Sequence, residues 1–259
     1  MAFRDILVFV DPTEDSPARL KLALELASEH GARLIGVEAC SEDAFLGQWR
    51  ERSIGLQGDF EAAVKAAGLR GTYRSLSPSK PAADLHIAHY ADLIIAPQPD
   101  FEMRALVAAP VPEHVMLMSG VPTIVLPTFW KLRPVGQSIV IAWNASREAT
   151  RAVHDALPFL VKARQVTIFT VATNAEAARS GSEMLVDHLK QHGVTALTSY
   201  WPSIGDATVV DGLFACLDTQ DADLIVAGAY GHSRWVESLF GGVSRDLIRQ
   251  PSMPVLMSH

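Results

Sequence analysis

The sequence has 259 residues, of which 49% are hydrophobic and 20% charged, and its formal net charge is −7. It has no apolar run near the roughly 20 residues of a membrane helix, and no basic patch of the size that nucleic acids or acidic membranes require. Cys40 and Cys216 are too far apart for a CxxC motif, and the first residues enter a strand-like run without a secretory segment. We therefore expect a cytoplasmic protein with buried, unreactive thiols, whose partner is a small molecule or a protein.

The first half of the chain predicts buried strands that alternate with helices. Residues 6–10 form a continuous apolar run, which is typical of a strand buried on both faces of a sheet. Ser16 and Pro17 then predict the start of a helix, with Ser16 as its N-cap. The apolar stripe expected on this helix consists of Leu20, Ala23, Leu24 and Ala27. Further strand-like runs follow at residues 33–38, 91–96 and 121–126.

The second half repeats the first at offsets of 131 to 133 residues, with strand-like runs at residues 138–144, 166–171, 222–227 and 253–257. A helix follows the first of these runs, and its expected apolar stripe is Ala149, Ala152, Val153 and Ala156. So regular a match indicates a duplication, and the alternation of strands with helices indicates parallel sheets covered on both faces. We predict an α/β fold of two tandem doubly wound units.

The domain boundaries follow from the same repeat. We expect a first domain at residues 1–127, a linker at residues 128–137 and a second domain at residues 138–259. The linker contains a proline and a glycine, which interrupt regular structure. Its aromatic residues Phe129 and Trp130 predict that it packs against a domain.

A glycine-rich loop follows the strand-like run at residues 222–227, and it contains Gly228, Gly231, Gly241 and Gly242. Glycines let the backbone approach a ligand closely and present N–H groups to phosphate oxygens. The last two precede a predicted helix, whose N-terminus favours an anion. Open parallel sheets also bind their ligands at the carboxyl ends of strands. Taken alone, these glycines would fit a tight turn without a ligand equally well.

The spacing of glycine, two residues, glycine, nine residues, glycine after a strand resembles the signature of the universal stress protein family. The resemblance extends over both halves of the chain, including their last strands. It implies five-stranded parallel units of the adenine nucleotide alpha hydrolase-like fold, which bind ATP, or ADP or AMP, through this loop. It also implies which residues contact the nucleotide. The implied phosphate contacts are Gly228, Gly231, Gly241, Gly242, Val243 and Ser244, and the implied adenosine contacts are Ala142, Trp143, Asn144 and Val171.

Some residues in and near this site depart from the family pattern or leave their role open. The family has Ser or Thr directly after the third glycine, where this chain has Gly242, and the next hydroxyl is that of Ser244. Asn144 replaces the usual aspartate and has no charge for a metal-bridged phosphate, so magnesium dependence stays open. His232 lies inside the loop and is a candidate for contact with phosphate or ribose.

Histidines elsewhere do not predict a metal site. His188 and His192 lie four residues apart on a predicted helix, but the sequence lacks the glutamate that accompanies such a pair in metalloproteases. We expect no metal ligands in this chain.

The corresponding loop of the first half cannot hold phosphate in the same way. Pro97 stands where the second half has its first glycine, and proline has no N–H to donate. Asp100 stands at the second glycine, and a carboxylate about 4 Å from a phosphate would cost about 4 kcal/mol per charge pair. We predict that the first site is inactive and that Asp11 stabilises its turn instead.

The leading interpretation is a nucleotide-binding regulatory module of the stress response. The sequence contains no convincing set of nucleophile, base and orienting residue, so we assign no catalytic residue. A slow ATP hydrolase at the same loop, and an interaction scaffold that binds no nucleotide, remain as alternatives. By the resemblance, the two units form a pseudo-dimer within one chain, and a further homodimer is left open.

Overall fold

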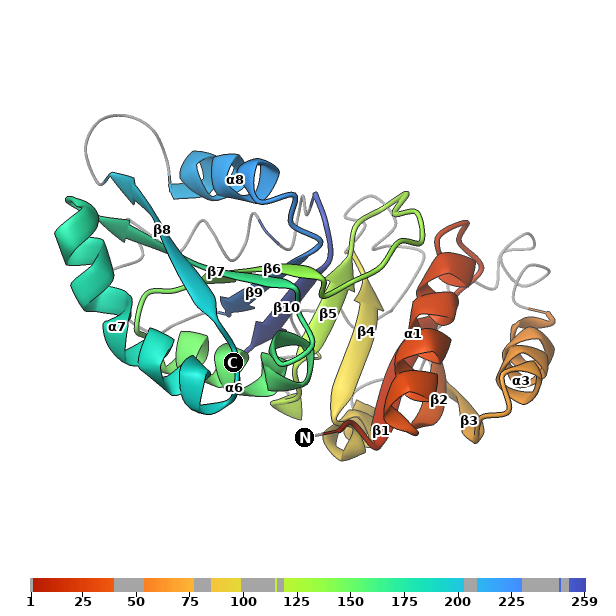
Figure 1. Ribbon diagram of the computed structural model, residues 1–259. Helices are drawn as coiled ribbons and strands as arrows, with labels where there is room; N and C mark the ends of the chain where they lie inside the picture. Colours follow the sequence, from red (N-terminus) through yellow and green to blue (C-terminus); the bar gives the residue numbers. More distant parts are fainter. Residues whose placement is uncertain are drawn as a thin grey trace. The chain divides into compact units, whose positions relative to one another are not determined.

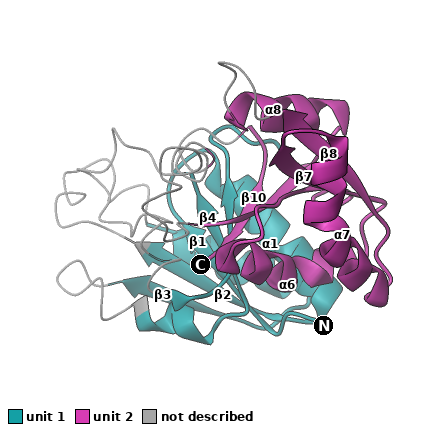
Figure 2. Ribbon diagram, turned by 90° about the vertical axis from the view of Figure 1, so that its left-hand side faces the viewer, with its two compact units in different colours: residues 1–132 teal, residues 133–259 magenta. Residues whose placement is uncertain are grey.

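The computed structural model describes residues 2–39, 54–76, 85–98, 115, 119–202, 209–229, 247 and 252–259. The chain divides into two compact units, Met1–Leu132 and Arg133–His259 (Figure 2). In the segment expected to be a linker, Trp130 is buried, whereas Phe129 is 77% exposed. The backbone N–H of Phe129 donates to Asp15 Oδ1 at 2.8 Å, which ties this segment to the first unit. One of the two aromatic residues is therefore packed as expected.

The first unit contains a parallel sheet. Its described strands are β1 (Asp5–Val10), β2 (Arg33–Ala39), β3 (Gly71–Leu76), β4 (Leu93–Pro97) and β5 (Thr123–Leu126), in the spatial order β3-β2-β1-β4-β5 (Figure 1). All neighbouring pairs of these strands are parallel. Its described helices are α1 (Ser16–His30), α3 (Leu56–Ala66) and the 3-10 helix η2 (Leu85–Tyr90).

The second unit repeats this topology. Its described strands are β6 (Ser138–Ala142), β7 (Gln165–Ala172), β8 (Ala196–Pro202), β9 (Leu224–Gly228) and β10 (Val255–Ser258), in the order β10-β9-β6-β7-β8, again with parallel pairs. Its described helices are α6 (Arg147–Leu160), α7 (Ala175–Gln191) and α8 (Val209–Thr219). Helix α8 covers one face of this sheet, and α6 and α7 cover the other (Figure 1). The predicted fold of two tandem doubly wound α/β units is confirmed.

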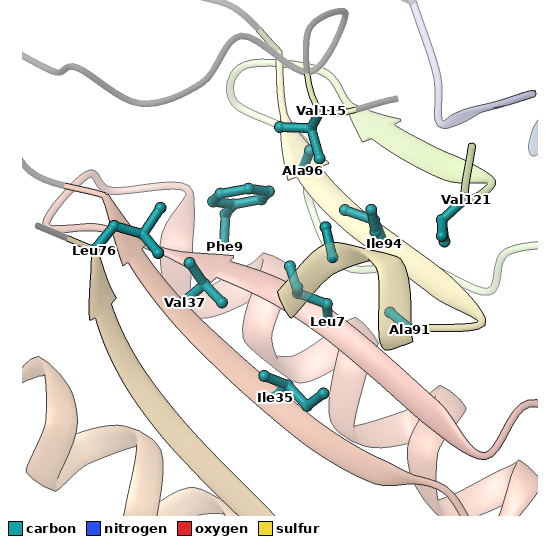
Figure 3. Packing of buried hydrophobic residues seen from close by; sticks show 11 residues of the cluster. Leu7, Phe9, Ile35, Val37, Leu76, Ala91, Ile94, Ala96, Val115 and Val121 are labelled. Carbon is teal, nitrogen blue, oxygen red and sulfur yellow. The ribbon is translucent and has the colours of Figure 1, made fainter. Parts of the chain in front are cut away.

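The central strand of the first unit is buried on both faces because nearly all its residues are apolar. Leu7 and Phe9 point to the same face, since strand residues two apart share a side. They belong to a buried cluster shown in Figure 3, whose other members are Ile35, Val37, Leu76, Ala88, Ala91, Ile94, Ala96, Val115 and Val121. The alternate residues Ile6 and Val8 face the other side of the sheet. Helix α1 packs against β1, β2 and β4.

The start of α1 differs from the prediction by one residue. The helix begins at Ser16, and Asp15 is at the N-cap position without a side-chain capping bond. Ser16 Oγ instead accepts a hydrogen bond of 3.1 Å from the backbone N–H of Asp11. Ser16 therefore stabilises the turn between β1 and α1.

The predicted apolar stripe of α1 is only partly correct. Ala23 and Ala27 are buried, but Leu22 and Leu26 complete the buried face instead of the predicted Leu20 and Leu24. The buried side chain of Arg19, one turn before Ala23, belongs to the same face. The buried face thus begins with a charged residue, which a pattern of apolar residues alone does not indicate.

One carboxylate in each unit holds the start of the central strand. Asp92 Oδ2 accepts hydrogen bonds from the backbone N–H groups of Arg4 and Asp5, at 2.7 and 3.0 Å. In the second unit, Asp223 Oδ1 accepts bonds of 2.7 and 3.0 Å from Gly136 and Gln137. The two aspartates are 131 residues apart, so the duplication extends to individual hydrogen bonds.

Candidate functional site

A pocket lies in the second unit at the carboxyl ends of β6, β7 and β9. It is lined by Ala142, Trp143, Asn144, Phe169, Thr170, Val171, Val209, Leu213, Ala227, Gly228 and Leu247. Strand β6 is followed along the chain by its neighbour β7, whereas β9, on its other side, is reached only after β8. The pocket therefore lies at the point where the strand order reverses, which is where open α/β sheets bind ligands.

The turn after β6 is held by three hydrogen bonds. The backbone N–H of Trp143 donates to Phe169 O at 2.8 Å, and its indole Nε1–H donates to Gly181 O of α7 at 3.1 Å. Asn144 Oδ1 accepts a bond of 3.1 Å from the N–H of Ser146, across Ala145, which has a positive φ of 56°. The indole and the turn are fixed before any ligand enters.

Helix α6 begins directly after this turn and is capped as its sequence requires. Ser146 Oγ accepts a bond of 3.1 Å from the N–H of Ala149, which makes Ser146 the N-cap. The amino end of α6, with its favourable dipole for a negative charge, therefore stands beside the pocket.

Gly228 has a packing role at the end of β9. A Cβ atom on Gly228 would lie 2.4 Å from Ala149 N and 2.6 Å from Glu148 C, both in the first turn of α6. Real Cβ atoms do not approach backbone atoms so closely, so the glycine is needed for α6 to pack on β9. This role is independent of any contact with phosphate.

None of the residues that line the described pocket has an ionisable side chain. Phe169, Val171, Val209 and Leu213 give it apolar walls, and its polar side chains are those of Trp143, Asn144 and Thr170. Such a lining suits a flat, uncharged ring with a polar edge.

Five of the residues implied by the resemblance line this pocket, namely Ala142, Trp143, Asn144, Val171 and Gly228. The others, Gly231, His232, Gly241, Gly242, Val243 and Ser244, lie outside the described residues. The apolar lining residues Phe169, Val209, Leu213 and Leu247 were not expected from the sequence. Val209 and Leu213 are four residues apart on α8, and this spacing was the available signal for a helix face towards the sheet.

The first unit has a large residue at the position that Ala142 occupies in the second. Phe9 and Ala142 are both the fifth residue of their strand, and they pair with Val37 and Phe169 at equivalent registers. Phe9 is 5% exposed and packs in the cluster with Val37, Leu76 and Ala96 (Figure 3). A buried ring therefore stands in the first unit at the strand position where the second unit has Ala142 at the edge of a pocket.

A buried ion pair follows at the same place in the first unit. Arg19, which is 1% exposed, forms an ion pair with Asp11 Oδ2 and donates through Nε to Phe9 O at 2.7 Å. Burial lowers the pKa of Arg19, and the carboxylates of Asp11 and Asp15 act in the opposite direction. Asp11 Oδ1 also accepts a bond of 3.0 Å from the N–H of Thr13, which confirms that Asp11 stabilises the turn.

At the equivalent positions of the second unit, which are described, there is no such pair. By the same offset of 133 residues, Asn144 corresponds to Asp11, and Ala152 corresponds to Arg19. Ala152 is buried and carries no charge. The two units thus differ in both size and charge at the carboxyl end of their central strand.

A second hollow, of about 560 Å³, lies at the opposite end of β6 and β7, lined by residues that include Arg133, Arg164 and Gln220. The side chain of Gln220 accepts hydrogen bonds from Gln165 and Thr167, at 2.6 and 3.1 Å. Because this end of a parallel sheet is not where ligands bind, we assign the site to the smaller pocket. Among the described residues, no group of three or more His, Cys, Asp or Glu side chains is arranged to hold a metal ion.

No protein-family model matches this sequence, and no curated protein does. Solved structures do resemble it. A universal stress protein from Archaeoglobus fulgidus DSM 4304 has a TM-score of 0.70 at 16% identity, with 97% of each chain covered. A candidate universal stress protein from Pseudomonas aeruginosa UCBPP-PA14 has a TM-score of 0.66 at 17% identity, with 98% of this chain and 92% of the other covered. A functionally unknown protein from Pseudomonas aeruginosa PAO1 has a TM-score of 0.65 at 16% identity, with the same coverage.

These similarities span both units, so the chain has the tandem fold of universal stress proteins. Within the part of the chain that is described, no helix is both long and apolar enough to cross a membrane.

Proposed function

We propose that this chain is a cytoplasmic tandem universal stress protein that binds one adenine nucleotide in its second unit, with ATP as the expected ligand and ADP or AMP as alternatives. In this proposal, the bound nucleotide regulates how the protein acts in the stress response. The observation that carries the proposal is the difference between Phe9 and Ala142. At one strand position, the first unit has a buried ring, and the second unit has a pocket.

The lining of the pocket supports an adenine base as the occupant. The base is flat, uncharged and polar at its edge, which matches apolar walls from Phe169, Val171, Val209 and Leu213. In the proposed complex, Ala142 leaves room for the ring. The backbone at Val171 supplies hydrogen-bonding groups for its polar edge.

In the proposed complex, different parts of the second unit contact the ribose and the phosphates. The turn at Trp143 and Asn144 borders the ribose, and the amino end of α6 favours the negative charge of the phosphates. Gly231, Gly241 and the residues that follow them supply further backbone N–H groups, as the resemblance implies. Asn144 has no charge to offer a magnesium ion, so we assign no magnesium ligand here and leave magnesium dependence open.

Equilibrium titration with ATP, ADP and AMP tests the proposal. Binding of one nucleotide per chain at micromolar to low millimolar concentration supports it. Absence of binding by all three nucleotides at millimolar concentration contradicts it, and then the scaffold interpretation gains support. Mass spectrometry of the purified protein under native conditions gives an independent check, since a retained adenine nucleotide identifies the natural ligand directly.

A further inference from the structure

Three histidines from two helices lie together in the second unit, away from the candidate pocket. His154 is on α6, His188 is on α7, and His192 follows the end of α7. The ring centres of His154 and His188 are 5.2 Å apart and the rings are stacked, with an angle of 29° between their planes. The ring centres of His188 and His192 are 4.8 Å apart in an edge-to-face arrangement. His188 is therefore the middle ring of the cluster.

The middle ring is poorly placed to carry a proton. His188 Nε2 is shielded from solvent and has no hydrogen-bond partner in the described part of the chain. Burial lowers the pKa of His188 below its ordinary value of 6.5, and positive charges on His192 and His154 lower it further. At neutral pH, His188 is therefore mostly uncharged, and it packs against both neighbouring rings as an apolar group.

The remaining charged groups near this cluster do not neutralise it. On α6, Arg151 and Asp155 are paired with each other at 2.8 Å. Helix α7 also packs against β7, which has no titratable side chain, and β8, which has only Tyr200. The neighbours of His188 in the sequence of α7 include Asp187 and Lys190, which are both exposed to solvent. The charges that act on His188 are those of the two other histidines.

We propose that His154, His188 and His192 form a proton-sensitive contact that holds the end of α7 against α6 at neutral pH and weakens when acid charges all three rings. Stacked neutral imidazoles attract each other, whereas two charged rings at about 5 Å repel. The unfolded chain has neither this burial nor this repulsion and binds a proton more readily at His188. The contact therefore contributes its full stability above pH 6.5, and this contribution is lost as the pH falls below that value.

Proton NMR of the histidine rings tests the proposal on the full chain. The His188 signal is identified by its loss in His188→Gln, and its pKa is read from a pH titration. We expect a pKa below 6.5 that rises by about 0.6 in His154→Gln, since one charge at 5 Å in water shifts a pKa by about that amount. His154 is exposed, so this variant is expected to fold. A His188 pKa at or above 6.5, or one that is unchanged in His154→Gln, overturns the proposal.

Amide hydrogen exchange gives a second readout that does not depend on the ring signals. The exchange rates of the last turn of α7 are measured at pH 7.5 and pH 5.0 and corrected for intrinsic rates. The increase in opening between these two pH values is expected to be about fourfold larger in the wild type than in His154→Gln. His86→Gln in the first unit is the matched control. It changes another close histidine pair, with ring centres 5.5 Å apart, and leaves the pH response of α7 as in the wild type. Equal pH responses in the wild type and His154→Gln contradict the proposal.

Discussion

Phe9 and Ala142 occupy the same strand position in the two halves of a duplicated chain, and one is a large aromatic residue whereas the other is small. Each is the fifth residue of the central strand in its unit, and each pairs with the neighbouring strand at the same register. Phe9 is buried in an apolar cluster, whereas Ala142 borders a pocket. A single side-chain size thus distinguishes the two units at the place where this type of sheet binds ligands.

The ion pair between Asp11 and Arg19 gives a prediction about the stability of the first unit. Asp11→Asn leaves the guanidinium of Arg19, which is 1% exposed, without its carboxylate. Removing one partner of a buried ion pair costs about 3–5 kcal/mol, so we expect a loss of unfolding free energy of this size in urea. The exposed pair of Arg151 and Asp155 is the control, and Asp155→Asn should cost less than about 1 kcal/mol.

The double variant Asp11→Asn with Arg19→Ala tests whether Asp11 and Arg19 stabilise the first unit as a pair. It introduces the uncharged pair that the second unit has at these positions, Asn144 and Ala152. We expect the double variant to lose less unfolding free energy than the two single variants lose together, because no unpaired charge remains buried. Strictly additive losses would show that Asp11 and Arg19 act independently.

Gly228→Ala tests the close packing of β9 against α6. The added Cβ would lie 2.4 Å from Ala149 N, so the helix must move, and we expect a loss of about 1–3 kcal/mol in unfolding free energy. Gly181→Ala is the matched control, because a Cβ there meets no atom within 4 Å and the residue is inside α7. The control is expected to gain about 0.5–1 kcal/mol, since alanine favours a helix more than glycine does. Equal stability of Gly228→Ala and the wild type would show that this packing is looser than described.

Cys216 is predicted to be unreactive in the folded protein. Its side chain is buried, and burial raises the pKa of its thiol, which outweighs a hydrogen bond with Ser199. In a Cys40→Ser background, we expect a thiol reagent at pH 7.5 to react with Cys216 at least about tenfold more slowly in buffer than in urea. Equal rates would mean that α8 opens readily from the sheet.

The sequence predicted the fold well because the central strands are long apolar runs. It did not reveal β3 and β8, since most of their residues are exposed or half-buried and their polar side chains interrupt any apolar run. Five of the eleven residues that line the candidate pocket could be anticipated by resemblance, namely Ala142, Trp143, Asn144, Val171 and Gly228. The apolar wall from Val209 and Leu213 could not, because it depends on which face of α8 meets the sheet.

Other relationships required the folded chain. The equivalence of Phe9 and Ala142 depends on strand register, which the apolar pattern alone leaves uncertain by one residue. His154 meets His188 only because α6 and α7 lie on the same face of the sheet. The sequence indicated the pair at His188 and His192 but gave no sign of a third ring from another helix.

Ala142→Phe tests the central claim most directly, because it places in the second unit the residue that the first unit has at this position. Calorimetric titration with ATP is expected to give one site per wild-type chain. Binding to Ala142→Phe should be at least about tenfold weaker, as expected if overlap with the base costs 1.4 kcal/mol or more. Phe9→Leu changes the same position of the first unit and should leave the wild-type binding intact, with circular dichroism confirming the fold of both variants. Wild-type ATP affinity in Ala142→Phe, or two sites per wild-type chain, would contradict the assignment of a single nucleotide site to the second unit.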